Sequence, residues 1–598
     1  MEQKVVIESH VADKRLNPVD ILFINLPSFS PDLSVSSDPT SANNVSPPLG
    51  LMYVANSIRD SEFVNSYNCV DFAISDFSGF SRHNQLTEFV NETLREKAVV
   101  QPGIVAVSLM FSSSYEFFKL VIDEIRRCWK DTKIMVGGVH ASNTVEYLLV
   151  NVPNIDYVTC GEGEEAFALF VENAATNTNK DILGVHSLGN IKKMSGCEPG
   201  VSNQFEQTDD VEMFNIDYTR YSDLIDMDVY TNETSLFSLS KTAVAVKAFS
   251  IMASRGCPYK CSFCASYSVH RRGSRWRDLQ NVIDEIYWLN KEHGVTKFYL
   301  IDDNFVPKAK AVELFNILST VDIDGFEVVI QNMSINATDH KIIDAIASTT
   351  ITNLAFAIES GSTAVQERIQ KNVGLQRAYD LVRYSHEKKL NVRAFYIIGF
   401  PEETISEMNE TFEYAASLGA DWSTFSVASP IPGTKMYDEF IQLGYIEDGP
   451  SSWTGHTIRD RTFDTKEISK EDIKDLAYRA NLKVNFINNV NIQKGDYENA
   501  ETIFKNFIMM YDFHIFAHDC LRRIYILTER PKEASDIVDQ MKNLLNSNER
   551  SRSFIKYFDL LDSDIATVLK FDLQLPLSSS PDDYLLPSNE VSEKVRKY

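Results

Sequence analysis

The sequence has little cysteine and a deficit of positive charge. Eight cysteines occur among 598 residues, and 58 lysines and arginines stand against 84 aspartates and glutamates, giving a formal net charge of −26. Proteins that coat duplex nucleic acid need a basic face to neutralise phosphates, so this balance argues against a nucleic-acid partner. The few, mostly scattered thiols also exclude a disulfide framework and predict a reduced, cytoplasmic protein.

Long apolar runs are missing as well. No stretch of about 18 apolar residues appears, so we predict no transmembrane helix and no membrane partner. The N-terminal 20 residues lack an apolar core and a small-residue cleavage pattern, so they do not match a secretory signal. With 44% hydrophobic and 11% aromatic residues, the chain can build sizeable cores. At ~100–200 residues per domain, its length predicts three or four domains.

Three of the eight cysteines are concentrated in ten residues, Arg255-Gly-Cys-Pro-Tyr-Lys-Cys-Ser-Phe-Cys264. Their spacing, Cys257-x3-Cys261-x2-Cys264, follows directly on a predicted strand. Zinc takes four ligands, often as two Cys-x2-Cys pairs, and the sequence has no matching second pair. A thioredoxin-like site would need two cysteines, not three. Three thiolates from one loop can instead hold three corners of a [4Fe–4S] cluster and leave the fourth iron open to another ligand.

The region from residue 20 to 175 alternates short apolar strands with helices. Continuous apolar strands separated by helices are typical of a parallel, doubly wound α/β sheet. Such sheets bind ligands at the carboxyl ends of their strands. We therefore expect one shared edge for the loops that follow residues 26, 108, 138 and 160.

The alternation returns between residues 248 and 430. Six strand–helix units predict a partial (β/α)6 barrel with its site at the strand carboxyl ends. The predicted strands cover residues 248–253, 297–301, 326–331, 354–358, 393–398 and 422–427.

The remaining segments carry weaker signals. Residues 176–245 are polar and acidic and predict a linker with some ordered pieces, and the last ~25 residues predict a partly ordered tail. Residues 451–598 predict a mainly helical domain. Within it, residues 499–504 align with 533–538 at an offset of 34, the tetratricopeptide period, although only two units match. The predicted domains are residues 1–175, 176–245, 246–450 and 451–598.

The cysteine motif resembles the signature of the radical S-adenosylmethionine (SAM) superfamily, which also favours an aromatic residue such as Phe263 before the last cysteine. This resemblance implies a [4Fe–4S] cluster on Cys257, Cys261 and Cys264, whose free iron binds the amino and carboxylate groups of SAM. One electron from the cluster then splits SAM into methionine and a 5′-deoxyadenosyl radical. The alternative is a structural zinc knot or three unrelated buried thiols.

Other predicted strand ends are similar to the SAM motifs of that superfamily. Ile301-Asp-Asp-Asn304 resembles the acidic motif for the SAM ammonium, although the usual glycine pair is absent, and an anionic acceptor suits a cationic donor. Glu359-Ser-Gly-Ser362 resembles the ribose site, whereas Ile398-Gly-Phe-Pro401 and Ser429-Pro-Ile-Pro-Gly-Thr434 resemble backbone contacts near the adenine. Taken alone, each could be an ordinary turn. The implied SAM-binding residues are Phe263, Asp302, Asp303, Glu359, Ser360 and Gly399.

A basic run, His270-Arg-Arg-Gly-Ser-Arg-Trp-Arg277, stands out in an acidic protein. Its arginines could contact the SAM carboxylate or an anionic substrate. A solvated start of a helix is the competing interpretation.

Turns rich in glycine and serine follow three predicted strands of the first region. Glycine lets a flat, bulky ligand approach the backbone. Together with Pro47-Pro-Leu-Gly50, these turns resemble the cobalamin-binding domain that precedes the barrel in one large class of radical SAM enzymes, a resemblance that covers about residues 20–440. The implied cobalamin-binding residues are Ser108, Leu109, Ser112, Gly137, Gly138, Val139, Gly161, Glu162 and Gly163.

The first region departs from other cobalamin proteins in one respect. The Asp-x-His-x-x-Gly motif that supplies a cobalt ligand is missing, and the loop after the first strand has no histidine, so we expect cobalt without a protein histidine. His140 is nearby, but a lone histidine at a strand end is more often a hydrogen-bonding residue than a ligand. The alternative is a flavodoxin-like domain that binds nothing.

The combined resemblance implies a cobalamin-dependent radical SAM enzyme that methylates an unactivated carbon, using one SAM to methylate cobalamin and a second to form the radical. Cyclisation, ring contraction or another rearrangement without methyl transfer is an alternative. A tRNA methylthiotransferase-like enzyme would need a second cluster on Cys69, Cys128 and Cys160, and a non-enzymatic scaffold is a further alternative. We expect a small-molecule or peptide substrate and an electron donor of the flavodoxin or ferredoxin type.

Overall fold

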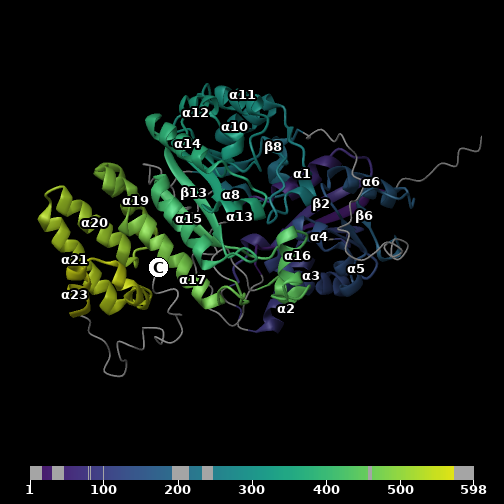
Figure 1. Ribbon diagram of the computed structural model, residues 1–598. Coiled ribbons are helices and arrows are strands. Elements are labelled where there is room, and N and C mark those ends of the chain that lie inside the picture. Colours follow the sequence, from purple (N-terminus) through teal and green to yellow (C-terminus); the bar gives the residue numbers. More distant parts are fainter. Residues whose placement is uncertain are drawn as a thin grey trace, which may run out of the picture. The chain divides into compact units, whose positions relative to one another are not determined.

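The computed structural model describes residues 17–29, 46–77, 80, 82–98, 100–190, 215–231, 247–454 and 461–571. The chain forms two compact units (Figure 1), one drawn mainly from residues before 211 and the other mainly from residues after 225. Cys197 and the predicted tail after residue 571 lie outside the described residues.

The first unit is built on a six-stranded sheet in the order β2-β1-β3-β4-β5-β6. Strands β1 to β5 pair in parallel, and β6 pairs with β5 antiparallel. The order 2-1-3-4-5 is that of flavodoxin-like, doubly wound sheets, so the predicted α/β class is confirmed. The strands are β1 (Val19–Asn25), β2 (Val64–Asp71), β3 (Ile104–Ser108), β4 (Lys133–Gly137), β5 (Tyr157–Thr159) and β6 (Val185–His186).

Amphipathic helices pack on this sheet. In α3, Phe117, Phe118, Val121 and Ile125 recur at helical spacing and are fully or almost fully buried. Helix α2 packs beside α3, and α1 packs beside α6. The helices of this unit are α1 (Leu49–Ile58), α2 (His83–Lys97), α3 (Tyr115–Cys128), α4 (Val139–Asn143), α5 (Val145–Asn151) and α6 (Glu164–Ala175), with short turns η1 (Phe72–Ile74) and η2 (Ser112–Ser114).

The second unit begins with the six parallel strands expected from the sequence. Two three-stranded sheets, β7-β10-β11 and β12-β13-β14, are joined by a parallel bridge between Met333 and Phe356. This succession forms a partial barrel whose strand carboxyl ends share one mouth. The strands are β7 (Ala248–Ile251), β10 (Lys297–Leu300), β11 (Glu327–Ile330), β12 (Asn353–Glu359), β13 (Asn391–Ile398) and β14 (Trp422–Val427).

Helices separate the barrel strands. Asp278 caps α10 by accepting from the backbone N–H of Gln280, and Gly294 ends it in the left-handed conformation that favours glycine. The helices are α10 (Leu279–His293), α11 (Lys308–Leu318), α12 (His340–Ala347), α13 (Thr363–Arg368), α14 (Leu375–Glu387), α15 (Ile405–Leu418) and α16 (Lys435–Gln442), with turns η4 (Ile335–Ala337) and η5 (Pro450–Ser452).

A helical region continues the second unit. Its first helix α17 and the turn η6 pack on β14, where the Asn485 amide accepts from the Ser423 N–H and donates to the Ser423 carbonyl, both at 2.7 Å. The elements are α17 (Lys470–Leu482), η6 (Lys483–Ile487), α18 (Val490–Lys494), α19 (Tyr497–Met510), α20 (Ile515–Leu527), α21 (Pro531–Ser547), α22 (Glu549–Arg552), η7 (Ser553–Leu560) and α23 (Ser563–Phe571).

The weak repeat in this region falls on α19 and α21, which both pack against α20. Ile503 and Phe507 are buried, and so are Ile537 and Met541, their counterparts 34 residues later. Equivalent positions therefore face a core, as a repeated helical hairpin requires. The tetratricopeptide assignment and the predicted domain boundaries stay predictions.

Short elements occupy the predicted linker and the basic run. The predicted linker contains β6, which extends the first sheet, and then η3 (Tyr218–Asp223) and α8 (Met227–Thr231). The first residue of the basic run, His270, ends a short helix α9 (Tyr267–His270). Arg275 and Trp276 form a strand β9 (Arg275–Trp276) that pairs antiparallel with β8 (Ser254–Arg255). The last member of the run, Arg277, is buried, so the expectation of a solvated or anion-binding residue is wrong there. Among the described helices, none is both long and apolar enough to cross a bilayer.

Candidate functional site

The three cysteines lie on one loop that follows β7 and β8 at the carboxyl end of the barrel. Two backbone hydrogen bonds of 2.9 Å clamp this loop, from the Ser262 N–H to the Ile369 carbonyl and from the Met436 N–H to the Ser262 carbonyl. Just before Cys257, Gly256 has φ +89°, and an added Cβ would overlap the carbonyl oxygen of Gly273. The path of the loop therefore requires glycine at this position.

The cysteine loop suits a cluster better than a single ion. Within the described part of the chain, no three Cys, His, Asp or Glu side chains converge closely enough to hold one metal ion, as a zinc knot would need. A cubane cluster takes one thiolate at each of several irons, so its ligands stand further apart. Burial raises the pKa of the Cys264 thiol to about 11, so this thiol is protonated at neutral pH until metal binds.

Two carboxylates after β10 hold the backbone that leads into the cysteine loop. Asp302 is 3% exposed and accepts from the Ser254 hydroxyl at 2.6 Å and from the backbone N–H groups of Ala253 and Ser254. Burial raises the pKa of Asp302 to about 6. Asp303 accepts from the Gly256 N–H at 2.9 Å. The carboxylate of Asp302 already accepts three hydrogen bonds from Ala253 and Ser254. Asp303 accepts one, so it is the better candidate of the two to bind SAM.

Glu359 ends β12 in a strained conformation, with φ +69° at a shift of register against β13. Such strain costs about 1–3 kcal/mol and persists at sites that the surroundings enforce. Its buried carboxylate lies 3.0 Å from the Lys371 ammonium, which also lies 6.0 Å from the centre of the Phe263 ring. Burial lowers the pKa of Lys371, but Glu359 and Cys261 outweigh it, so the pKa is raised and the side chain is charged.

Ser360 and Gly399 follow neighbouring strands, β12 and β13, and have different partners. The buried Ser360 hydroxyl lies 2.9 Å from the Thr411 hydroxyl of that helix, so it holds the turn. Gly399 has φ +82°, donates its N–H to Glu403 at 2.6 Å and accepts from Arg461 Nη1 at 3.0 Å. Phe400 follows and packs on Phe263, with ring centres 5.7 Å apart. Phe263 of the cysteine loop thus packs on the residue after Gly399, and Ser360 is directed to α15.

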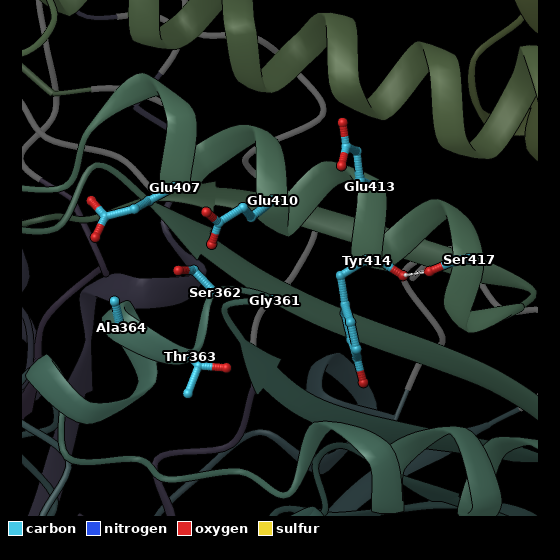
Figure 2. Close-up of a pocket in the computed structure, with 9 residues that line it drawn as sticks. All are labelled: Gly361, Ser362, Thr363, Ala364, Glu407, Glu410, Glu413, Tyr414 and Ser417. Carbon is cyan, nitrogen blue, oxygen red and sulfur yellow. Dashed lines mark hydrogen bonds between the residues drawn. The ribbon is translucent and has the colours of Figure 1, made fainter.

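The turn after Ser360 also lines an open groove of about 640 Å³. Figure 2 shows Gly361 to Ala364 on one side of it and Glu407, Glu410 and Glu413 of α15 on the other. None of the residues predicted to bind the cluster, SAM or cobalamin lines this groove. Gly361 and Ser362 of the Glu359–Ser362 motif do line it, so the groove borders the predicted ribose site.

The sequence reasoning did not select four residues that the structure places in this region: Asn304, Lys371, Glu403 and Arg461. Asn304 ends the acidic motif, and the resemblance assigns it no role. Glu403 lies four residues after Gly399, a spacing at which a side chain can return to the backbone of its own turn. Lys371 and Arg461 lie 12 and 62 residues from their partners, and no motif spacing relates them.

In the first unit, Ser108 of β3 pairs in register with Gly137 of β4. Gly138 has φ +109°, and its Cβ position would lie 2.6 Å from the carbonyl oxygen of Leu109, so the two turns approach closely. Beside Gly137, an added Cβ would meet only Thr159 among the described residues, at 3.9 Å. The Thr159 hydroxyl is buried and has no hydrogen-bond partner there. The glycine turn and the unsatisfied Thr159 hydroxyl thus lie together at the carboxyl edge of the sheet.

The other predicted cobalamin residues lie at the same sheet edge, after β3, β4 and β5: Ser112 in η2, Val139 at the start of α4, and Gly161, Glu162 and Gly163 before α6. Ser112 Oγ lies 2.8 Å from His140 Nδ1. His140 is 2% exposed, and burial lowers its pKa to about 4, so it is neutral. It is a hydrogen-bonding residue, as expected.

Comparison with known families and proteins agrees with this arrangement. Residues 40–171 match the family described as B12 binding domain, and residues 251–415 match the radical SAM superfamily.

An uncharacterised methyltransferase from Pyrococcus horikoshii is 27% identical over 73% of this chain and 86% of its own length. Cytidylyl-2-hydroxyethylphosphonate methyltransferase of Streptomyces wedmorensis is 26% identical over 67% and 79%. An anaerobic magnesium-protoporphyrin IX monomethyl ester cyclase of Cereibacter sphaeroides is 23% identical over 66% and 60%.

Two solved structures share the fold. The radical SAM methyltransferase TsrM from Kitasatospora setae, solved with cobalamin and a [4Fe–4S] cluster, superposes with a TM-score of 0.52 at 16% identity, over 73% of this chain and 82% of its own. The cobalamin-dependent SAM radical enzyme OxsB superposes with a TM-score of 0.54 at 13% identity, over 93% and 84%.

Proposed function

Because this chain belongs to the cobalamin-dependent radical SAM enzymes, we propose that it transfers a methyl group from SAM to an unactivated carbon of a small-molecule or peptide substrate. The observation that carries the proposal is the clamped three-cysteine loop at the barrel mouth, tied through Lys371 to the strained Glu359. Two of the relatives are named methyltransferases, which favours methyl transfer over the other reactions of the class.

When bound, the cluster supplies the electron that splits SAM into a 5′-deoxyadenosyl radical and methionine, and cobalamin carries the methyl group. The chain's part is to hold and orient these groups. Cys257, Cys261 and Cys264 present three thiolates from one rigid loop. The Glu359 carboxylate is an anionic acceptor for the ribose hydroxyls, and its charge is fixed in place by Lys371.

In the first unit, the glycine turns admit a flat ligand to the sheet edge. The glycine turn at Gly137 and the unsatisfied Thr159 hydroxyl beside it support a site for the cobalamin tail at this edge. His140 is 2% exposed, and this burial argues against its use as a cobalt ligand.

A rearrangement without methyl transfer is the second candidate, because a cyclase is among the relatives. The methylthiotransferase alternative fits poorly. Cys69 lies on β2 and Cys160 directly follows β5, and three strands separate β2 from β5 in the sheet. At ~4.8 Å per strand, these thiols stand about 19 Å apart across the sheet and cannot share a cluster.

The test is anaerobic reconstitution with iron, sulfide and cobalamin, with a flavodoxin-type electron donor as the proposed partner. Methyl transfer predicts that substrate drives formation of S-adenosylhomocysteine and 5′-deoxyadenosine in equal amounts. 5′-Deoxyadenosine alone would indicate a rearrangement. The triple Cys257→Ala, Cys261→Ala, Cys264→Ala variant should form no 5′-deoxyadenosine, and formation in that variant would refute the cluster assignment.

A further inference from the structure

Asn304 reaches one of the three cysteines directly. Its side-chain Nδ2 lies 3.7 Å from Cys257 Sγ, within the range for a hydrogen bond to the large sulfur atom. Asn304 is 3% exposed, so water does not compete for this contact. It is therefore the one buried side-chain amide that the described residues place against a thiol of the cysteine loop.

The orientation of this amide is fixed by its own neighbour. The Asn304 Oδ1 accepts a 3.0 Å hydrogen bond from the backbone N–H of Phe305. An amide whose oxygen is taken by a donor must present its NH2 group on the other side. The group that faces Cys257 is thus a donor.

A hydrogen-bond donor at this position affects the reduction potential of a cluster. Adding one electron to a [4Fe–4S] cluster increases the negative charge on its sulfur ligands. A hydrogen bond to a ligand sulfur stabilises the more negative state, and such bonds are among the factors that set cluster potentials. The bond requires a thiolate acceptor, which Cys257 becomes when it binds iron.

Resting on the proposed function, we propose that Asn304 tunes the reduction potential of the cluster by donating a hydrogen bond to the Cys257 thiolate. The step is the one-electron reduction of the cluster by a low-potential donor, with no bond broken. The amide makes this reduction easier. Asn304 is the last residue of the acidic motif after β10. One turn therefore positions the cysteine loop through Asp303 and tunes the reduction potential of the cluster through Asn304.

The test is a redox titration of the reconstituted full chain with titanium(III) citrate, followed by electron paramagnetic resonance. Asn304→Leu removes the donor at similar volume, and Asn304→Asp also keeps the acceptor for Phe305. Asn353→Leu is the control, because Asn353 is also buried, at 8% exposed, but starts β12, at the opposite end of the barrel.

We expect both Asn304 variants to keep full iron and sulfide but to shift the potential negatively. A tenfold change in the reduction equilibrium is about 59 mV for one electron. The control should retain the wild-type potential. An unshifted Asn304→Leu would overturn the proposal, and an equal shift in the control would do the same. A wild-type protein that takes up no cluster would instead overturn the proposed function.

A second measurement uses the unmodified protein and does not depend on how the variants fold. With asparagine labelled with ¹⁵N in its side-chain amide, pulsed paramagnetic resonance of the reduced cluster should show a weakly coupled ¹⁵N nucleus. Absence of that coupling would show that no side-chain amide contacts the cluster.

Discussion

Glu403 is a fully buried carboxyl group behind the Gly399 turn. One of its oxygens accepts from the N–H groups of Gly399 and Phe400, whereas the other has no hydrogen-bond partner among the described residues. Burial raises its pKa to about 8, although both backbone donors act in the opposite direction. The folded protein therefore retains a proton that the unfolded chain releases at a lower pH.

The raised pKa of Glu403 predicts that the folded protein loses stability as pH rises from about 4.5 to 8. The contribution of Glu403 to the free energy of unfolding is fully present below its pKa in the unfolded chain, near 4.5. It is lost as pH rises towards 8, at up to ~1.4 kcal/mol per pH unit. Glu403→Gln keeps an acceptor for both N–H groups and cannot ionise. We expect its urea midpoint to fall less than that of the wild type between pH 5 and 8.5. Urea midpoints that change equally with pH in the wild type and in Glu403→Gln would contradict a raised pKa at Glu403.

Glu359 and Ser360 are neighbours with different partners, and they make a matched pair. Glu359→Gln removes the negative charge opposite Lys371 and the charged acceptor for SAM. The loss of one charge-assisted hydrogen bond, roughly 1.5–3 kcal/mol, corresponds to ~10–100-fold weaker SAM binding. Ser360→Ala should leave the affinity unchanged, because the Ser360 hydroxyl bonds Thr411. Isothermal titration of the cluster-loaded protein with SAM measures the affinity of both variants. Weaker SAM binding by Ser360→Ala would show that the Ser360 hydroxyl contributes to the ribose site.

Among the elements, the cysteine loop depends on the hairpin of β8 and β9. Gly256 and Gly273 lie across from one another there, and only the first is sterically confined. Gly256→Ala places a methyl group against the Gly273 carbonyl at positive φ and should displace Cys257. Iron and sulfide per chain should fall clearly, whereas Gly273→Ala, which has open space around it, should keep the full cluster. Equal cluster content in both variants would contradict this account.

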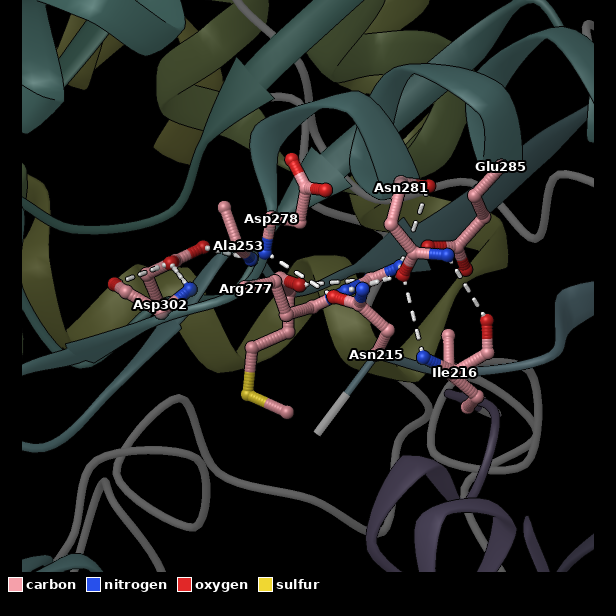
Figure 3. A network of polar contacts seen from close by, with 10 residues as sticks. Asn215, Ile216, Ala253, Arg277, Asp278, Asn281, Glu285 and Asp302 are labelled. Atoms are coloured by element: carbon pink, nitrogen blue, oxygen red, sulfur yellow. Dashed lines mark hydrogen bonds and ion pairs between the residues drawn. The ribbon is translucent and has the colours of Figure 1, made fainter. Parts of the chain in front are cut away.

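The start of α10 joins three elements through buried polar contacts (Figure 3). Arg277 forms a 2.7 Å ion pair with Glu285, with side chains 0% and 1% exposed, and donates to the Met252 carbonyl at 3.0 Å. Asn281 bonds both Arg277 and the backbone of Ile216, in the segment before η3. The network therefore ties that segment to the end of β7.

Removing one partner of this ion pair should be harmful, because it leaves a buried charge uncompensated. We expect Arg277→Met to lower the free energy of unfolding by about 3–5 kcal/mol. The double variant with Glu285→Leu should recover most of that loss. Urea denaturation of apo protein measures both, and a double variant as unstable as the single one would show that the arginine acts mainly through the backbone carbonyl.

The elements also show what a sequence can and cannot predict. Six apolar runs located the six barrel strands because buried parallel strands are apolar throughout. The two-residue strand β6 escaped because it is too short for any periodicity. The cysteine loop was found from spacing alone. The pairs Lys371–Glu359 and Arg461–Gly399 were not, because each depends on how distant loops meet at the barrel mouth.

At the scale of the whole molecule, each unit has its own predicted cofactor site. The cobalamin site of the first unit can be tested in the full chain without a cluster or SAM. Its sheet reverses strand order between β1 and β3, the place at which doubly wound sheets bind ligands. The loop after β1 has no histidine in its sequence. The nearby His140 is held by Ser112, and its ring lies 6.1 Å from that of Tyr115.

We therefore expect the full chain to bind cobalamin with no histidine on cobalt. Paramagnetic resonance of the cob(II)alamin form should show no nitrogen splitting from an axial ligand, because the loop after β1 has no histidine and His140 is buried. His140→Ala should bind cobalamin with the same spectrum. A triplet splitting that disappears in His140→Ala would make that residue the ligand and overturn the expectation. Weak axial donation favours homolytic release of a methyl group, so the absence of splitting also supports methyl transfer to a carbon radical.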